Sequence, residues 1–240
     1  LSRKDNLVVF KNLTQVNLIT TSTEKLAVYL KDLLHSQGHL EMPLAVLPDF
    51  ISEAEMLNCN RPLKSTSNRF RIGLIGFLNK ADDYAKLRST FCNLSKTMKE
   101  QFEIVLFGWD GTHLHQDLFD TCYVERVKSV SFIKYLEILG SLQLDVALLP
   151  ISRDQFQSFG RSTLLFSELA SLSIPVMTDS DSAYSSAILN RETGLIVSQH
   201  QQWEDKLSAL IKGSIENTTM GQMAHKEILA YKTWDDTNSA

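Results

Sequence analysis

Residues 145–179 restrict the possible folds of this chain more than any other segment. They read DVALLPISRDQFQSFGRSTLLFSELASLSIPVMTD, with an unbroken apolar run near each end. The runs Asp145–Leu149 and Ile174–Met177 predict buried strands, because a parallel strand that is covered on both faces is apolar throughout. The stretch Ser162–Ser173 between them predicts a helix, and a helical crossover is the usual connection between two parallel strands. The segment therefore predicts a β-α-β unit.

The same alternation of strands and helices extends over most of the chain. The other predicted strands are Val16–Thr21, Pro43–Leu47, Arg71–Phe77, Glu103–Phe107, Tyr123–Val127 and Leu195–Val197. The other predicted helices are Glu24–Ser36, Ala81–Lys99, Phe132–Gly140, Ser182–Asn190, Gln202–Gly213 and His225–Trp234. Such alternation predicts an α/β fold with a doubly wound parallel sheet, in which ligands bind outside the carboxyl ends of the strands.

The start of the predicted helix at Ser162 is a candidate site for an anion. Unpaired N–H groups and the positive end of the helix dipole can hold a phosphate there, beside Arg161 and Thr163. Glu168 lies seven residues after Arg161, on the same helical face and about 10 Å along the axis. This spacing suits a nucleotide, with the diphosphate at the helix start and the ribose hydroxyls at Glu168. A simple capping role for Ser162 and a solvated position for Glu168 are the alternatives.

The charge balance and the hydropathy pattern exclude two classes of function. Lysine and arginine number 24 against 28 acidic residues, a net charge of −4, so the chain has no basic field for nucleic acid. No apolar run approaches the roughly 18 residues that a membrane span needs. The opening residues predict no signal peptide. We therefore expect neither a nucleic-acid partner nor a membrane span.

No motif for a metal or a dinucleotide is present in the sequence. The three cysteines are Cys59, Cys92 and Cys122. Their spacing matches no metal site and predicts unpaired buried thiols in a reducing cytoplasm. His113 and His115 lack the spacing of a helical zinc site, and the pair Gly73 and Gly76 lacks the third glycine of an NAD fingerprint. No G-x-S-x-G element is present either. We expect no metal ion and no cofactor.

Several of these motifs together resemble one enzyme family. Arg161-Ser162 before a helix that carries Glu168, followed by the strand SIPVMTD, resembles the nucleotide-sugar half of GT-B glycosyltransferases. The resemblance is to the group 1 bacterial enzymes of surface-polysaccharide synthesis. It continues through RIGLIGF at residues 71–77 and ETGLIV at residues 192–197, and it covers most of the chain.

The resemblance implies a fold and a division into domains. The fold would be the Rossmann-like half of a GT-B fold. Residues 1–50 would be a remnant of the acceptor-side domain and residues 51–69 a linker. Residues 70–223 would form the donor nucleotide-sugar-binding domain, and residues 224–240 a C-terminal helix that crosses back. Because the chain opens on Leu and reads as if it began within a domain, we expect a fragment or processed chain whose partner is the missing N-terminal acceptor domain.

The resemblance also implies roles for individual residues. Glu168 would bind the ribose, Ser162 and Thr163 the diphosphate, and Arg161 and Lys80 would stabilise the charge that develops on the departing diphosphate. The other substrate-binding candidates are Gly160, Asn79, Ser131, Phe132 and Tyr184. For three of the candidates an ordinary role is an open alternative: a solvated lysine for Lys80, a core position for Phe132 and plain packing for Tyr184.

The chain departs from the family pattern at two positions near Glu168. Gly160 stands eight residues before it, where classical retaining members carry the acid that faces the sugar, and Leu165 replaces a common basic residue. The favoured prediction is a cytoplasmic enzyme that transfers a sugar from a nucleoside diphosphate sugar to a glycan acceptor. The alternative is a non-catalytic, glycosyltransferase-like binding or scaffold module, which Gly160 and the bulky pair Phe77-Leu78 favour. A different flavodoxin-like ligand-binding domain is a third possibility.

Overall fold

A computed structural model describes most of the chain. The described residues are 12–13, 15–38, 42–52, 68–76, 83–109, 121–151, 161–231 and 233–234. Among these residues, none of the helices has the length and apolarity that crossing a bilayer requires. Cys92 and Cys122 are free thiols, and Cys59 lies outside the described residues.

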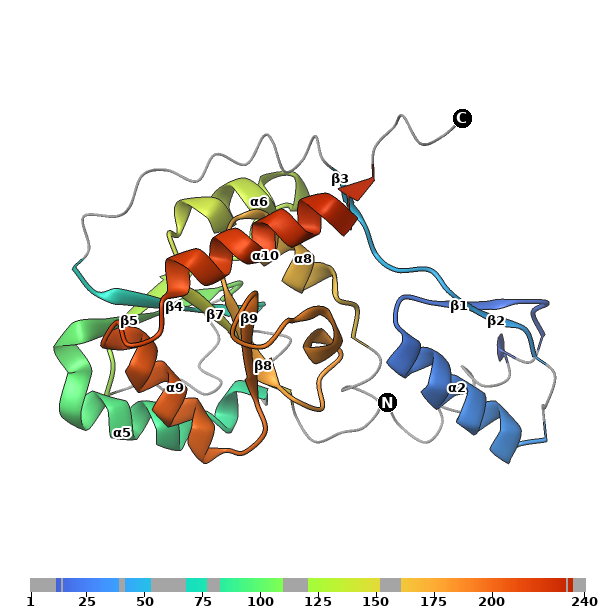
Figure 1. The fold of residues 1–240 in the computed structure, drawn as a ribbon, viewed down its shortest axis with the longest axis horizontal. Coiled ribbons are helices and arrows are strands. Elements are labelled where there is room, and N and C mark those ends of the chain that lie inside the picture. Colours follow the sequence, from blue (N-terminus) through green and yellow to red (C-terminus); the bar gives the residue numbers. More distant parts are fainter. Residues whose placement is uncertain are drawn as a thin grey trace.

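A parallel sheet of six strands organises the larger part of the molecule (Figure 1). Its strands are β4 (Phe70–Ile75), β5 (Phe102–Phe107), β6 (Val124–Val127), β7 (Val146–Leu149), β8 (Val176–Asp179) and β9 (Gly194–Val197). They lie in the order β6-β5-β4-β7-β8-β9, and every pairing is parallel. Strands β5 and β6 thus extend the sheet on one side of β4, and β7, β8 and β9 follow on the other side. This confirms the predicted doubly wound sheet, whose ligand crevice is expected where the strand order reverses, between β4 and β7.

Helices cover both faces of this sheet (Figure 1). The helices are α5 (Arg88–Met98), α6 (Phe132–Ser141), α8 (Leu164–Ser171), α9 (Gln201–Ile211) and α10 (Asn217–Tyr231). Residues of α5 and α9, among them Phe91 and Trp203, share one buried cluster with strand residues such as Ile104. Residues of α6, α8 and α10 share the other cluster with Val105. Because neighbouring strand residues point to opposite faces, the sheet has a separate core on each side.

A smaller β-α-β unit precedes the six-stranded sheet. Strands β1 (Ile19–Thr21) and β2 (Leu44–Val46) pair in parallel, and α2 (Glu24–Ser36) connects them. After β2 the chain reaches β3 (Ile51–Ser52), which pairs in parallel with β10 (Thr233–Trp234) after α10. Ile51 is buried in the same core as α8, so the first residues of the predicted linker are already part of the packed structure.

Three predicted helices are wrong in kind or in extent. The helix predicted at Ala81–Lys99 is interrupted by a turn at residues 86–87, and α5 begins at Arg88. In place of a helix at Ser182–Asn190 the structure has a short 3-10 helix, η3 (Tyr184–Ala187). Serine side chains bond the local backbone there: the Ser185 hydroxyl donates to the Ser180 carbonyl at 2.8 Å. Such bonds compete with α-helix formation. The predicted last helix, His225–Trp234, begins earlier and ends earlier as α10, and its predicted final residues form β10.

Close packing of α10 on α8 explains the glycine at position 221. A Cβ atom on Gly221 would lie 2.1 Å from the carbonyl oxygen of Ser173, the turn that follows α8. Gly221→Ala should therefore lower the free energy of unfolding by about 1–3 kcal/mol, although alanine is the better helix former in isolation. Chemical denaturation would measure the change, with the exposed neighbour substitution Gln222→Ala as the control. Equal or higher stability of Gly221→Ala would contradict this close packing.

Candidate functional site

A cavity of about 480 Å³ opens at the carboxyl edge of the six-stranded sheet. Its lining residues come from the end of β4, from α6, from the start and first turns of α8, and from η3. They are Ile75, Gly76, Tyr135, Arg161, Ser162, Leu164, Leu165, Glu168 and Tyr184. Gly76 ends β4 with a φ of 67°, a left-handed conformation that glycine adopts without steric cost. The cavity lies where the strand order reverses.

The structure brings four of the sequence-predicted residues to this cavity. Arg161 and Ser162 lie at the start of α8, Glu168 lies further along the same helix, and Tyr184 comes from η3. Leu164 and Leu165 line the wall between the two ends of the site. The predicted helical face is therefore the face that α8 presents to the cavity.

Arg161 is held by a buried partner. Its guanidinium forms an ion pair with Asp83, whose side chain is 2% exposed. Tyr184, also buried, lines the same cavity. Burial raises the pKa of Tyr184, and the positive charge of Arg161 opposes that rise. The arginine side chain is thus fixed at the cavity wall, and Asp83 already compensates part of its positive charge.

Ser162 caps the first turn of α8. Its hydroxyl accepts the N–H of Leu164 at 2.9 Å and donates to the carboxylate of Asp49. The capping role that the sequence allowed is therefore present. Thr163 is buried and makes no capping bond with its side chain, and it does not line the cavity. A carboxylate stands at the helix start, where the sequence predicts a phosphate.

Asp49, which follows the first β-α-β unit, joins it to the edge of the larger sheet through Ser162. Lys25 of α2 does so as well: its ammonium donates to the Ser182 carbonyl at 2.8 Å and to the Ser185 hydroxyl at 3.0 Å. Burial lowers the pKa of Lys25, while the charge of Asp181 acts in the opposite direction. The smaller unit therefore contacts the larger one beside the cavity, at the start of α8 and at η3.

Tyr135 is a cavity residue that the sequence analysis missed. It comes from α6, and its ring stacks on Phe107 of β5, with ring centres 5.5 Å apart and planes 12° from parallel. Burial, with the negative charge of Glu168 as the next cause, raises the pKa of Tyr135. Its four-residue spacing to Leu139, which is buried in the same core, was the available signal.

The other candidates that the structure describes do not line this cavity. Ser131 and Phe132 do not line it, and the Phe132 side chain is 78% exposed, so the core alternative for Phe132 is wrong. Lys80, Asn79 and Gly160 lie outside the described residues.

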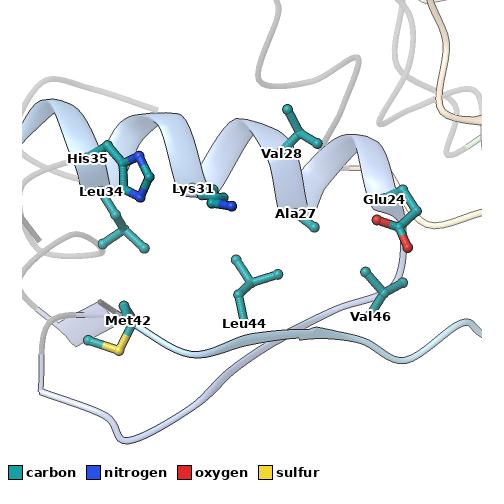
Figure 2. Close-up of a pocket in the computed structure, with 9 residues that line it drawn as sticks. All are labelled: Glu24, Ala27, Val28, Lys31, Leu34, His35, Met42, Leu44 and Val46. Carbon is teal, nitrogen blue, oxygen red and sulfur yellow. The ribbon is translucent and has the colours of Figure 1, made fainter. Parts of the chain in front are cut away.

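A second cavity, of about 510 Å³, lies in the smaller unit between α2 and β2. Figure 2 shows apolar side chains on its strand side and both polar and apolar ones along the helix. Glu24, Lys31 and His35 of α2 line it, facing Leu44 and Val46 of β2. Of the sequence-predicted site residues that the structure describes, none lines this cavity.

Comparison with solved structures supports the fold described above, a doubly wound parallel sheet. No family model matches the sequence, and no curated protein does. Many solved structures match in three dimensions. Sucrose-phosphate synthase from Thermosynechococcus elongatus has a TM-score of 0.65 at 12% identity, over 90% of this chain and 54% of that one. HepE from Anabaena, in complex with UDP and glucose, has a TM-score of 0.64 at 13% identity. That match covers 91% of this chain and 60% of HepE.

A third match is WaaG, a glycosyltransferase involved in lipopolysaccharide biosynthesis, with a TM-score of 0.63 at 14% identity. It covers 87% of this chain and 57% of WaaG. The chain thus spans about half of the length of these proteins. With a doubly wound sheet and a cavity where its strand order reverses, the chain has the fold of the C-terminal domain of GT-B glycosyltransferases.

Proposed function

We propose that the cavity at the start of α8 binds a nucleoside diphosphate sugar, as the donor site of a glycosyltransferase. The observation that carries the proposal is the convergence of Arg161, Ser162 and Glu168 on one cavity. A volume of about 480 Å³ falls within the range of small-molecule sites. Arg161 and Ser162 lie just before α8, and Glu168 lies four residues after Leu164, about 6 Å along the axis, which suits a diphosphate at the helix start and a ribose beside Glu168.

The chemistry proposed here is positioning and electrostatic stabilisation. Breaking the bond between sugar and diphosphate leaves negative charge on the diphosphate, and the α8 N–H groups with Arg161 would stabilise it. Lys80 is proposed as a second cation, from the sequence. Of the cavity-lining residues that the structure describes, Arg161 is the cationic one, and Asp83 partly neutralises it. A further positive charge would therefore favour binding of a diphosphate.

We further propose that the acceptor is a glycan in surface-polysaccharide synthesis, and that the cytoplasm is the site of reaction. Acceptor binding would require the remainder of an acceptor-side domain beyond residues 1–50. The contacts of Lys25 and Asp49 support this arrangement, since they join the smaller unit to the rim of the donor cavity. We expect this chain by itself to bind the nucleotide but to transfer little sugar. Efficient sugar transfer by the isolated chain would contradict the proposal that acceptor binding needs a further domain.

A nucleotide panel tests the donor-site proposal. UDP, GDP, ADP and dTDP would each be titrated into the protein by calorimetry, with thermal shift as a second readout. HepE, a protein of similar fold, was crystallised with UDP and glucose, which makes UDP the first choice. Micromolar binding of at least one nucleotide is the expected result. Failure of all four would favour the alternative, a non-catalytic scaffold, for which the glycine at position 160 is the supporting observation.

The carboxylate of Asp49 should weaken binding of the diphosphate, because it stands at the same helix start. Asp49→Asn keeps a hydrogen-bond acceptor for Ser162 and removes the charge. We expect it to tighten nucleoside diphosphate binding about 3- to 10-fold, from the loss of repulsion near the surface. Calorimetry would measure the affinities, with Asp205→Asn, an exposed position on α9, as the control for net charge. Unchanged or weaker binding by Asp49→Asn would place the diphosphate elsewhere.

A further inference from the structure

Among the described residues, the two most exposed large apolar side chains are neighbours at the start of α6. Phe132 is 78% exposed and Ile133 is 91% exposed, and Val130 just before them is 37% exposed. Single apolar residues are common on protein surfaces, but adjacent ones form a patch, and such patches mark contact with a partner or a membrane. We call Val130, Phe132 and Ile133 the apolar tip.

The apolar tip lies at the carboxyl edge of the six-stranded sheet. It follows β6, which is the edge strand on one side of the sheet. The later turns of α6 pack on the sheet, with Leu139 buried in the core, while the first turn leaves Phe132 and Ile133 in solvent. The apolar tip lines neither of the two cavities described above, so neither cavity accounts for it.

The charges beside the apolar tip in the chain are positive. Lys128 precedes it and Lys134 follows it, and both are exposed. The first turn of α6 carries no acidic residue, and the positive end of the helix dipole lies there. Glu137, the acidic residue of α6, lies about one turn further along the helix. Apolar side chains beside lysines are typical of segments that bind the interface of an anionic bilayer.

The lysines favour a membrane over a protein as the partner. Protein interfaces are depleted of lysine, whereas at a bilayer the lysine stem can lie along apolar groups while the ammonium contacts a lipid phosphate. A bilayer also needs no matching pocket for two large apolar side chains. The whole chain has a net charge of −4, so its attraction to anionic lipid would be local to this region and would weaken with salt.

We infer that the apolar tip, with Lys128 and Lys134, binds the surface of a membrane that contains anionic lipid. Phe132 and Ile133 would enter the boundary between headgroups and acyl chains, and the two lysines would contact the phosphates. Binding of this kind is confined to the surface and needs no membrane span. It would hold the carboxyl edge of the sheet, where the donor cavity also opens, near the bilayer. The inference does not depend on the proposed donor site.

Co-sedimentation with lipid vesicles tests the inference. The vesicles would contain phosphatidylcholine alone, or phosphatidylcholine with about one quarter phosphatidylglycerol. We expect the wild type to bind the anionic vesicles at least about 10-fold more strongly than the neutral ones. Phe132→Ser with Ile133→Ser should weaken binding to the anionic vesicles about 10-fold or more, because the inserted apolar area is lost. Lys128→Gln with Lys134→Gln should weaken it about as much.

Matched pairs of substitutions elsewhere on the surface are the controls. Leu47→Ser with Leu189→Ser removes two exposed apolar side chains, and Lys96→Gln with Lys212→Gln removes two exposed lysines. Both control variants should bind the vesicles as the wild type does. Since all of these positions are exposed, thermal denaturation should show that each variant is folded.

Three results would overturn the inference. The first is a wild type that does not bind the anionic vesicles. The second is binding that Phe132→Ser with Ile133→Ser leaves unchanged, and the third is equal binding to neutral and anionic vesicles. Light scattering would identify the alternative occupant, a second copy of this chain. Self-association that the apolar double variant abolishes, without any vesicle binding, would assign the apolar tip to a protein contact instead.

Discussion

Glu168→Gln should lower the affinity for the nucleoside diphosphate about 10- to 100-fold. Hydrogen bonds to a charged acceptor contribute about 1.5–3 kcal/mol each, and each 1.4 kcal/mol is a factor of ten in the dissociation constant. The amide keeps the length of the side chain but loses the charge, and its NH₂ group offers a donor where a ribose hydroxyl offers another donor. The loss should come from ribose recognition and leave the diphosphate contacts in place. Calorimetry on folded protein would measure it.

The control for this substitution is Glu137→Gln. Glu137 is an exposed glutamate of α6, the helix that also carries Tyr135, so the change in net charge is the same. It should bind nucleotide as the wild type does. An affinity of Glu168→Gln within about twofold of wild type would mean that Glu168 has no contact with the ligand.

The Arg161–Asp83 ion pair should give the second large effect, on both folding and binding. Arg161→Met alone would break the ion pair with the buried carboxylate of Asp83, and breaking a buried ion pair from one side costs about 3–5 kcal/mol of stability. The double variant Arg161→Met with Asp83→Asn removes both charges and should recover much of that stability. It should nevertheless bind the nucleoside diphosphate at least about 10-fold more weakly, because the guanidinium contact with phosphate is lost.

The binding readout for the double variant is the difference between nucleoside diphosphate and nucleoside monophosphate. The wild type should gain affinity from the second phosphate, and the double variant should lose most of this gain. Asp83→Asn alone is the control, since it retains the guanidinium. If the double variant is folded and still gains as much from the second phosphate as the wild type, Arg161 is only a structural partner of Asp83.

Much of the fold could be predicted from local sequence patterns. The helix Glu24–Ser36 was predicted with the bounds that the structure has, because its apolar spacing is regular; in the structure Thr23 caps its start by accepting the N–H of Leu26. The strands of the six-stranded sheet were predicted to within two residues at each end, since most of them are short apolar runs between polar segments. Side-chain bonds to the backbone were not predictable from spacing, and they shortened the predicted helix at 182–190 into η3.

The site could be predicted only in part. Arg161 lies just before α8 and Glu168 within it, so their place at one end of this helix could be predicted from the local pattern. Their partners come from distant segments: Asp83 is 78 residues from Arg161, and Asp49 is 113 residues from Ser162. Tyr135 comes to the same cavity from a different helix. These contacts depend on how α6, α8 and the end of β4 pack together, which no local pattern contains.

The most direct test is a crystal structure of this chain with the nucleoside diphosphate that stabilises it most. The account predicts the diphosphate at the start of α8 beside Arg161, with Asp49 moved away from Ser162. It also predicts the ribose hydroxyls within hydrogen-bond distance of the Glu168 carboxylate. A nucleotide bound in the cavity between α2 and β2, or one whose ribose does not contact Glu168, would contradict it.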